Sequence, residues 1–354
     1  MEVLTTSRRT RYKKREAKTP RTIRIGIVGC GYWGPNLIRN FHDIASVEIA
    51  ALCDLEENRL KPFARKFPLS KLTVRYQDLI SDDSLDALVI ATPISTHYEI
   101  ARCALRAGKH VLIEKPLAET TRQAAILTEL ASRHDRILMV GHTFEYNPAV
   151  LKIAELLKKG ELGKLYYIDS IRVNLGLHQT DGLNVVWDLA PHDLSIILHW
   201  INEIPQRVSA WGQAFVQNRT EDIAFLRLEF PSGILAHIHV SWLAPTKIRR
   251  MTVVGDKKMV IYDDLEHAEK IKIVDRGAHW DPASPALKVG YRMGDIVSPR
   301  IETTEPLTQE CHHFIQCILQ NSRPRTDGEK GIQVVRILEA ADKSLKKGGG
   351  PVSV

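Results

Sequence analysis

Short apolar segments alternate with amphipathic ones over the first 145 residues. The apolar segments have the length of buried strands, and the segments between them have the spacing of helices. This alternation predicts a parallel sheet with helices on both faces. Thr96 and Glu99 have the spacing of a capping box at the start of one helix, and Gly108 suits its end. The predicted strands are 24–28, 47–53, 85–91, 110–114 and 136–141, and the predicted helices are 35–42, 56–67, 96–107 and 120–134.

The pattern changes after about residue 145 to an alternation of apolar and polar positions, clearest over 236–242 and 226–230. Such alternation is typical of a sheet with one packed face and one more polar face. The connections at 231–233 and 255–257 are short enough for antiparallel hairpins. The predicted strands are 166–175, 208–216, 223–230, 234–243, 250–254, 259–262 and 271–274, and helices near 307–319 and 331–345 follow.

These two patterns predict an α/β chain with two domains. A length of 354 residues suits two domains of ordinary size, and 44% hydrophobic and 26% charged residues fit a globular protein with a real core. We expect a parallel-sheet domain over 23–142 and a second domain with a mostly antiparallel sheet over 143–347. A basic tail over 1–22 precedes them.

The positive charge of the chain is concentrated in that tail. Residues 1–21 hold eight Lys or Arg and two Glu, which leaves +1 of the net +7 for the rest of the chain. A short polar segment that buries no apolar area is expected to be disordered. An arm for an anionic partner is the alternative. A nucleic-acid function is disfavoured because the body of the chain is nearly neutral.

The cysteines and the hydropathy pattern favour a cytoplasmic protein without a membrane partner. Five cysteines form no C-x-x-C pair and are odd in number, which indicates reduced thiols. No apolar run approaches the ~20 residues that a bilayer requires. The basic N-terminus is not followed by the hydrophobic segment of a secretory signal.

A glycine motif lies where a dinucleotide site would require it. Gly29, Gly31 and Gly34 form G-x-G-x-x-G directly after a buried strand and before a helix, with Tyr32 and Trp33 between them. The first glycine allows the tight turn, the second lets backbone approach a pyrophosphate, and the third lets helix and strand pack closely. The helix N-terminus then attracts the phosphates.

Asp54 ends the second predicted strand, 20 residues after Gly34. An acidic residue there hydrogen-bonds the adenosine ribose hydroxyls and repels a 2′-phosphate, which favours NAD over NADP. Arg59 lies close enough in sequence to keep NADP as an alternative.

Two further segments follow strand ends that lie at the same edge of the predicted sheet. Thr92 and Pro93 end the third strand, and Glu114 with Lys115 ends the fourth. In open α/β sheets, ligands bind at the carboxyl ends of the strands. Lys115 is followed by a proline that holds its turn rigid, so we expect it in the site. A solvated turn residue is the alternative.

Asp188 and His192 are four residues apart at a helix start and therefore share a face. Asp188 is also a plausible helix N-cap, and His192 could be structural. A zinc site at Cys311 and Cys317 is disfavoured because residues six apart on a helix lie ~240° apart around its axis.

Together these motifs resemble the Gfo/Idh/MocA oxidoreductase family. The resemblance rests on the glycine motif, Cys-Asp, Ala-Thr-Pro-x-x-x-His, Glu-Lys-Pro and Asp-x-x-x-His, in this order, and runs from about residue 23 to 347. Segments 141–148 and 168–174 look like a branch associated with surface-polysaccharide or nucleotide-sugar genes. The family often has glycine where this chain has Ala190 and Pro191, which predicts a different local turn around His192.

The resemblance implies a Rossmann domain followed by an α/β domain with a large, open, mostly antiparallel sheet, through which such proteins dimerise or tetramerise. It implies hydride transfer between a nicotinamide and a carbinol carbon of a sugar, inositol, sugar acid or nucleotide sugar. The residues implied for the cofactor are Gly29, Gly31, Tyr32, Trp33, Gly34, Asp54, Arg59, Thr92, Pro93, His97, Glu114, Lys115 and His142. Those implied for the substrate are Lys115, Arg172, Asn174, Asp188 and His192.

For the chemistry, we expect His192 to accept the hydroxyl proton, because a neutral imidazole titrates near working pH. Lys115 is expected to stabilise developing negative charge on the same oxygen. The two could exchange these roles, and Asp188 would orient a hydroxyl or the histidine. The alternative is a regulator or scaffold that binds the cofactor without chemistry. Retention of Lys115, Asp188 and His192 together favours an enzyme, and no metal is expected.

Overall fold

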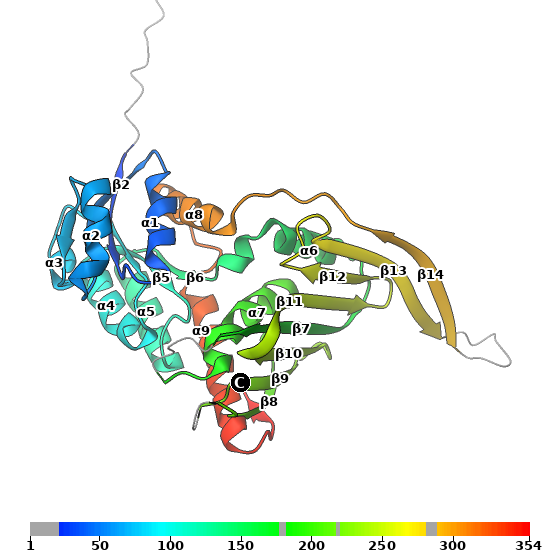
Figure 1. Cartoon of the computed structure of the whole chain (residues 1–354). Coiled ribbons are helices and arrows are strands. Elements are labelled where there is room, and N and C mark those ends of the chain that lie inside the picture. The colour runs from blue at the N-terminus through cyan, green and yellow to red at the C-terminus, as the bar shows by residue number, and fades with distance from the viewer. Residues whose placement is uncertain (1–20, 177–181, 217–219, 281–288) are drawn as a thin grey trace, which may run out of the picture.

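The computed structural model describes residues 21–176, 182–216, 220–280 and 289–354, and they form two sheets with helices around them (Figure 1). Residues 1–20 of the predicted tail lie outside the described residues. Arg21, the last basic residue of that tail, is described, and its guanidinium donates to the Asp86 carboxylate at 2.6 Å.

The first sheet is parallel, with strand order β3-β2-β1-β4-β5-β6. This order reverses between β1 and β4, and doubly wound folds bind dinucleotides at such a switch point. The predicted class of this domain is therefore confirmed. Its strands are β1 Ile23–Val28, β2 Val47–Cys53, β3 Lys71–Thr73, β4 Ala87–Ile90, β5 His110–Glu114 and β6 Leu138–Gly141.

Alternate residues of the parallel strands face opposite sets of helices. Ile25 on β1 and Val89 on β4 belong to a core that includes α1 and α8, whereas Leu88 and Ile113 belong to a core that includes α4, α5 and α9. Strands buried on both faces read as continuous apolar runs, which is why they were predictable. The helices are α1 Gly34–His42, α2 Glu57–Lys66, α3 Gln77–Ile80, α4 Ile94–Arg106 and α5 Thr121–Arg133.

The second sheet has the order β14-β13-β12-β11-β7-β10-β9-β8-β15, and its neighbours are antiparallel except for β10 and β7. Both predicted hairpins are confirmed, at β9–β10 and β11–β12. The strands are β7 Leu165–Leu175, β8 Arg207–Gln213, β9 Ile223–Glu229, β10 Leu235–Ser241, β11 Leu243–Gly255, β12 Met259–Asp263, β13 Ile271–Trp280, β14 Val289–Val297 and β15 Val352–Ser353.

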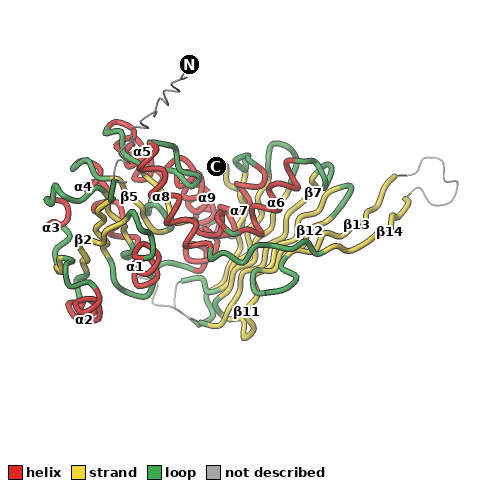
Figure 2. The backbone as a smooth tube through the Cα atoms, turned by 90° about the horizontal axis from the view of Figure 1, so that it is seen from above, coloured by secondary structure: helices red, strands yellow, loops and turns green. Residues whose placement is uncertain are grey.

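Helices cover one face of this second sheet and the other face is open (Figure 2). α7 packs on β10 and β7, and α9 packs on β8. The β13–β14 ribbon extends away from the body, as both views show (Figures 1 and 2). The remaining helices are η1 Thr143–Tyr146, α6 Pro148–Lys158, α7 Val185–Ile201, α8 Pro306–Gln320 and α9 Gly328–Lys346.

Helix α8 belongs to the predicted second domain by sequence but packs against the first. It falls within 143–347, yet it packs against α1 of the first domain, with the rings of Phe41 and Phe314 edge to face at 6.3 Å. The chain therefore returns to the first domain after β14, before β15 adds the last strand of the second sheet.

One predicted helix start was wrong, and the alternative role of Asp188 as a helix cap is excluded. α4 begins at Ile94 rather than at Thr96, whose hydroxyl instead bonds back to the Pro93 carbonyl at 2.8 Å. α7 is capped by Asn184, not by Asp188. α7 also continues through Pro191 without a separate turn, although this proline cannot donate to the carbonyl of the preceding helical turn. Gly108, in contrast, follows α4 with a φ of +73°, as predicted.

Candidate active site

The glycine turn between β1 and α1 contains two glycines that the fold itself requires. Gly29 has a φ of +99°, and a Cβ there would collide with the carbonyl oxygen of Ala91. A Cβ on Gly34 would collide with the Gly29 carbonyl. At Gly31, a Cβ would meet only the flexible end of Arg59, at 3.2 Å. Packing therefore does not explain why this position is a glycine. The absence of a side chain at Gly31 lets a ligand approach the backbone closely.

This turn also has free donors for an anionic ligand. Among the described residues, no hydrogen bond uses the backbone N–H of Gly31, Tyr32 or Gly34. α1 starts at Gly34 and has no acidic residue in its first turn, so the positive end of its dipole is not neutralised. Unpaired N–H groups at a helix N-terminus suit a phosphate, and these residues fit the pyrophosphate of a dinucleotide.

Asp54 links the end of β2 to the glycine turn. One carboxylate oxygen accepts the Cys30 N–H at 2.7 Å and the other accepts the Glu56 N–H at 2.9 Å. Arg59 lies near it, with Nη1 at 3.9 Å, but its other Nη bonds Glu56 at 2.6 Å. The charge of Asp54 thus lies beside the turn, while Glu56 largely neutralises Arg59.

Lys115 connects the two domains. It follows β5, and its Nζ donates to the Asp188 carbonyl at 2.8 Å and lies 3.4 Å from Asp188 Oδ1. The other carboxylate oxygen of Asp188 accepts the Trp242 indole N–H at 2.9 Å. The side chains of Lys115 and Asp188 are 18% and 26% exposed, so a substrate can reach them. An ammonium group has three N–H donors, which leaves one of them for a ligand.

His192 lies one helical turn after Asp188 on α7, and its imidazole packs edge to face on Phe144 at 5.0 Å. Its Nδ1 has no hydrogen-bond partner among the described residues. Burial first, and then the positive charges of Lys115, Arg172 and Arg249, hold the pKa of His192 well below its ordinary value. The ring is therefore neutral near pH 7, and it is a weaker base than the histidine titrating near working pH that the sequence predicts.

Arg172 lies beneath this histidine as half of a buried ion pair. Its Nε and Nη2 donate to the Asp193 carboxylate at 2.8 and 3.0 Å, and both side chains are at most 3% exposed. The guanidinium also stacks on Phe144, 4.6 Å from the ring centroid. Arg172 was predicted to bind substrate, but its observed contacts hold the residue next to His192. Asn174, two residues along the same strand, is half-buried.

His97 does not have the free polar atom that the predicted cofactor contact needs. Its ring is 1% exposed, and both nitrogens face backbone carbonyl oxygens, of Thr92 at 2.8 Å and Pro116 at 2.9 Å. Thr92 and Pro93 lie at the end of β4, as predicted, where the Thr92 and Thr96 hydroxyl oxygens are hydrogen-bonded at 2.7 Å. His97 thus supports this edge of the sheet from inside.

Glu114 lies at the same edge as Lys115, next to the glycine turn. Its carboxyl packs against Gly141 and receives hydrogen bonds from the Lys115 N–H and the Trp33 side chain. Burial raises the pKa of Glu114 to about 7, against the opposing charge of Lys115. Trp33 and Glu114, both predicted for the cofactor, therefore lie together, while Tyr32 is 92% exposed beside them.

A cluster of three buried polar side chains, His142, Glu145 and Glu310, was only partly predicted. His142 was implied for the cofactor, and neither of its ring nitrogens has a partner among the described residues. Burial lowers the pKa of His142 to about 3. Glu145 and Glu310, both at most 1% exposed, were missed, because nothing in their local sequence distinguishes them from surface glutamates. Lys330 Nζ binds Glu145 at 2.7 Å, and Thr143 donates to Glu310 at 2.7 Å.

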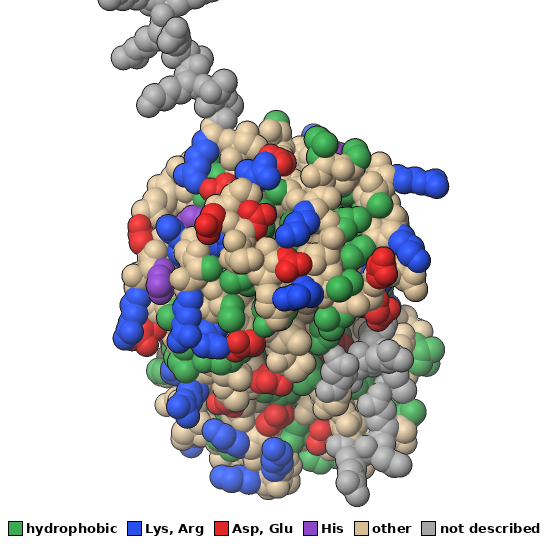
Figure 3. All heavy atoms as spheres, turned by 90° about the vertical axis from the view of Figure 1, so that its left-hand side faces the viewer, with side chains coloured by type: hydrophobic (Ala, Val, Ile, Leu, Met, Phe, Trp, Pro, Cys, Tyr) green, Lys and Arg blue, Asp and Glu red, His purple; other side chains and the backbone are tan. Residues whose placement is uncertain are grey.

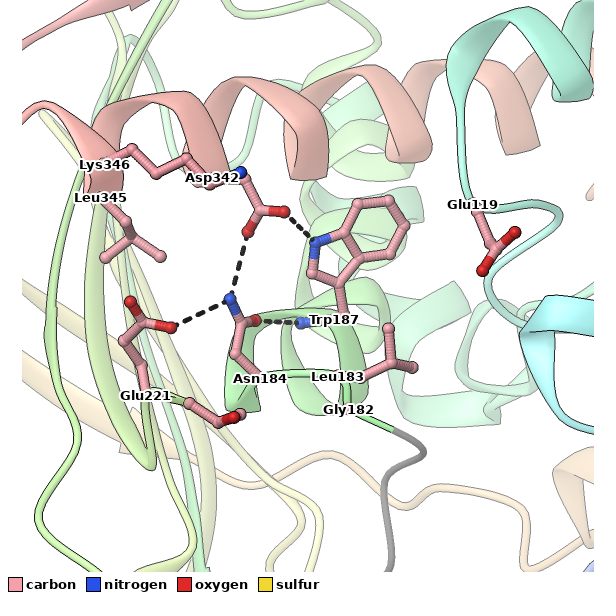
Figure 4. A pocket seen from close by; sticks show the side chains of 10 residues that line it. Glu119, Gly182, Leu183, Asn184, Trp187, Glu221, Asp342, Leu345 and Lys346 are labelled. Carbon is pink, nitrogen blue, oxygen red and sulfur yellow. Dashed lines mark hydrogen bonds between the residues drawn. The ribbon is translucent and has the colours of Figure 1, made fainter. Parts of the chain in front are cut away.

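A cavity of about 430 Å³ lies beside the start of α7 (Figure 4). Asn184 caps the helix there, accepting the N–H groups of Val186 and Trp187. Its amide donates to Glu221 and Asp342, and Asp342 also accepts the Trp187 indole N–H at 2.9 Å. This network joins α9 to the first turn of α7, the helix that carries Asp188 and His192.

Two further features bear on partners. On the face of Figure 3, basic and acidic side chains are interspersed. Among the described residues, no helix has the length and apolar content needed to cross a membrane.

On α8, Cys317 Sγ lies 3.5 Å from His313, while Cys311 is buried in the core shared with α1.

Comparison with known proteins matches both halves of the chain to one family. Residues 23–142 match the model described as "Oxidoreductase family, NAD-binding Rossmann fold", and residues 150–261 match the GFO/IDH/MocA C-terminal domain. The UDP-N-acetylglucosamine 3-dehydrogenase of Acidithiobacillus ferrooxidans is 26% identical, over 88% of this chain and 94% of that protein. The myo-inositol 2-dehydrogenase of Thermotoga maritima is 24% identical, over 92% and 97%.

Among solved structures, the aldose-aldose oxidoreductase of Caulobacter crescentus superposes with a TM-score of 0.81 at 21% identity, covering 94% of this chain and all of that one. This likeness shows that the fold is shared across both domains. Together, the two domain matches and this likeness confirm the fold and the family that the motifs predict. The chain belongs to the Gfo/Idh/MocA family of oxidoreductases, which bind NAD on a Rossmann domain.

Proposed function

We propose that this protein is an NAD-dependent dehydrogenase or reductase for a carbinol or keto carbon of a sugar, an inositol or a nucleotide sugar. The observation that carries the proposal is the contact between Lys115 Nζ and Asp188, at 2.8 Å to its carbonyl. It places an ammonium group within electrostatic reach of the His192 imidazole, at the sheet edge that holds the glycine turn. The names of the relatives, a nucleotide-sugar and an inositol dehydrogenase, support the substrate class.

The cofactor would lie along the carboxyl ends of the strands of the parallel sheet. The turn from Gly29 to Gly34 would bind its pyrophosphate, and Asp54 its adenosine ribose. Thr92, Pro93 and Glu114 lie at the next strand ends, toward the second domain. When bound, NAD supplies the hydride acceptor for oxidation. NAD is favoured over NADP because Asp54 presents negative charge and Glu56 engages Arg59.

The protein's own groups divide the proton chemistry between them. The neutral His192 ring accepts the proton of the substrate hydroxyl. Lys115, with one N–H left after its two contacts with Asp188, donates to the same oxygen and stabilises its developing charge. Asp188 holds Lys115 and is itself held by Trp242. This assignment makes His192 the base and Lys115 the electrostatic stabiliser.

The open face of the second sheet supports assembly with a second copy of the chain. Aromatic rings stack across it, with Trp211 and Phe225 at 5.9 Å and Phe225 and His239 at 4.4 Å. Trp211 and Tyr167 are 56% and 47% exposed on the same sheet. Exposed apolar surface of this kind marks an interaction site. We expect Trp211→Glu to lower the mass measured by light scattering, and Leu69→Glu, on the first domain, to leave it unchanged.

We place the protein in the cytoplasm because all five cysteines are free. Cys30 and Cys53 lie close enough to interact electrostatically, yet form no disulfide. Burial raises the pKa of both thiols to about 12, so neither is a reactive thiolate.

The experiment that tests the function is a panel of sugars, inositols and nucleotide sugars with NAD and NADP, followed by the absorbance of the reduced cofactor. The proposal expects reduction of NAD by at least one member of the panel. Binding of NAD by calorimetry without turnover of any member would favour a regulatory protein. Absence of NAD binding would overturn the proposal altogether.

A further inference from the structure

Two backbone carbonyl oxygens point at one buried imidazole on the first turn of α4. His97 Nε2 lies 2.8 Å from the Thr92 carbonyl, and Nδ1 lies 2.9 Å from the Pro116 carbonyl. Thr92 lies at the end of β4, and Pro116 lies after β5, the neighbouring parallel strand. The ring therefore lies between two segments of the candidate site, with 1% of its own surface exposed.

The chemistry of this arrangement is unusual for a histidine. A carbonyl oxygen only accepts hydrogen bonds, and a neutral imidazole has one N–H. A neutral ring therefore bonds one carbonyl, and only a protonated ring bonds both. Burial first, and also the positive charge of Lys115, lower the pKa of His97, while the two carbonyl contacts raise it. An apolar residue would leave the carbonyl that the ring bonds without a partner.

The Pro116 contact bears directly on Lys115. Lys115 immediately precedes Pro116, and its Nζ reaches across to the Asp188 carbonyl of the second domain. A change in the position of the Pro116 carbonyl moves the backbone from which Lys115 extends. We propose that His97 is a positioning residue for Lys115, which it serves by donating its Nδ1–H to the Pro116 carbonyl and so fixing the turn after β5. For turnover, this inference rests on the function proposed above.

Two amide substitutions separate the contacts of the ring. The amide nitrogen of asparagine lies where Nδ1 lies, and that of glutamine where Nε2 lies. His97→Asn therefore keeps a donor for Pro116 and loses the one for Thr92, and His97→Gln does the reverse. His97→Phe loses both. His110→Phe is the matched control, because His110 also bonds backbone, accepting the Ile137 N–H at 3.0 Å, but lies at the opposite end of β5.

The first measurement needs no substrate. Reductive methylation of the full-length protein, followed by mass spectrometry, reports how firmly the Lys115 amine is held. We expect Lys115 to be labelled several-fold faster in His97→Gln and His97→Phe than in the wild type, and at the wild-type rate in His97→Asn and His110→Phe. Equal labelling of Lys115 in His97→Gln and His97→Asn would overturn the proposal. Thermal unfolding confirms that each variant is folded, and the two amide variants decide the matter if His97→Phe is not.

The second measurement is kinetic and uses whichever sugar of the panel is turned over. A displacement of a reacting group by ~1 Å costs about 100-fold in rate, so we expect kcat of His97→Gln to fall by ~10–100-fold. The NAD dissociation constant should change far less, and His97→Asn should recover most of kcat. A loss confined to NAD affinity would contradict a role through Lys115. If the wild type turns over no sugar, the proposed function fails, while the labelling result still decides the role of His97.

Discussion

Replacing Lys115 with methionine is the sharpest test of the proposed chemistry. Methionine has a similar length and no charge, so Lys115→Met removes the ammonium and little volume. The Lys115 side chain makes its two contacts with Asp188, and neither touches the glycine turn. Asp188 keeps its bond from Trp242 at 2.9 Å, so the start of α7 stays anchored. NAD affinity is therefore expected to stay nearly unchanged.

The loss in rate follows from the one N–H that Lys115 has free for a ligand. Removing a single preorganised donor from a developing oxyanion costs about 100- to 1,000-fold in kcat, or about 3–4 kcal/mol. A second effect has a defined sign. The charge of Lys115 helps to hold the pKa of His192 down, so its removal raises that pKa. Because the base must be neutral, the acidic limb of the pH profile moves to higher pH.

The assay is cofactor reduction by a turned-over sugar, measured across pH, with calorimetry for NAD. Lys109→Met is the matched control, since Lys109 is buried at the other end of β5 and donates to the Asp82 and Leu85 carbonyls at 2.6 and 3.1 Å. That variant should lose stability and keep the turnover of its folded fraction. If Lys115→Met retains turnover within a few-fold of the wild type, the reasoning is refuted.

Three further predictions concern the cofactor, a helix cap and a buried carboxyl. Asp54→Asn should weaken NAD more than NADP, because it removes the charge that repels a 2′-phosphate; calorimetry with both cofactors tests this, and an unchanged affinity ratio contradicts it. Asn184→Ala should lower the free energy of unfolding by about 1 kcal/mol, because α7 loses its cap, with Asn58→Ala on the exposed surface as control in a denaturant titration. Burial raises the pKa of Glu145 to about 7, above its ordinary 4.5. Its contribution to stability is therefore full below about pH 4.5 and is lost as pH rises through about 7. Unfolding curves of Glu145→Gln should lack this part of the decline between pH 4.5 and 7, and identical pH slopes would argue against a raised pKa.

The sequence by itself determined most elements of the first domain, though not β3 and α3, and the position of its ligand edge. β2 and β5 have the predicted bounds, and the glycine motif lies between β1 and α1. Buried parallel strands and amphipathic helices are encoded by local periodicity, and Lys115 follows a strand end, which topology places at the carboxyl edge. Most of the sheet of the second domain was likewise readable from its alternation, whereas β14, β15 and α6 were not predicted.

Only the tertiary structure decided how the site is assembled. Lys115 meets Asp188 across 73 residues, and Trp242 supports that carboxylate from the bend between β10 and β11. Glu145 and Glu310 look like ordinary glutamates until packing buries them. His97 was predicted to touch a cofactor, and the structure assigns both of its nitrogens to backbone. Periodicity records which face of an element is apolar, but the partner of a polar side chain depends on which elements pack together, and that is settled by the whole fold.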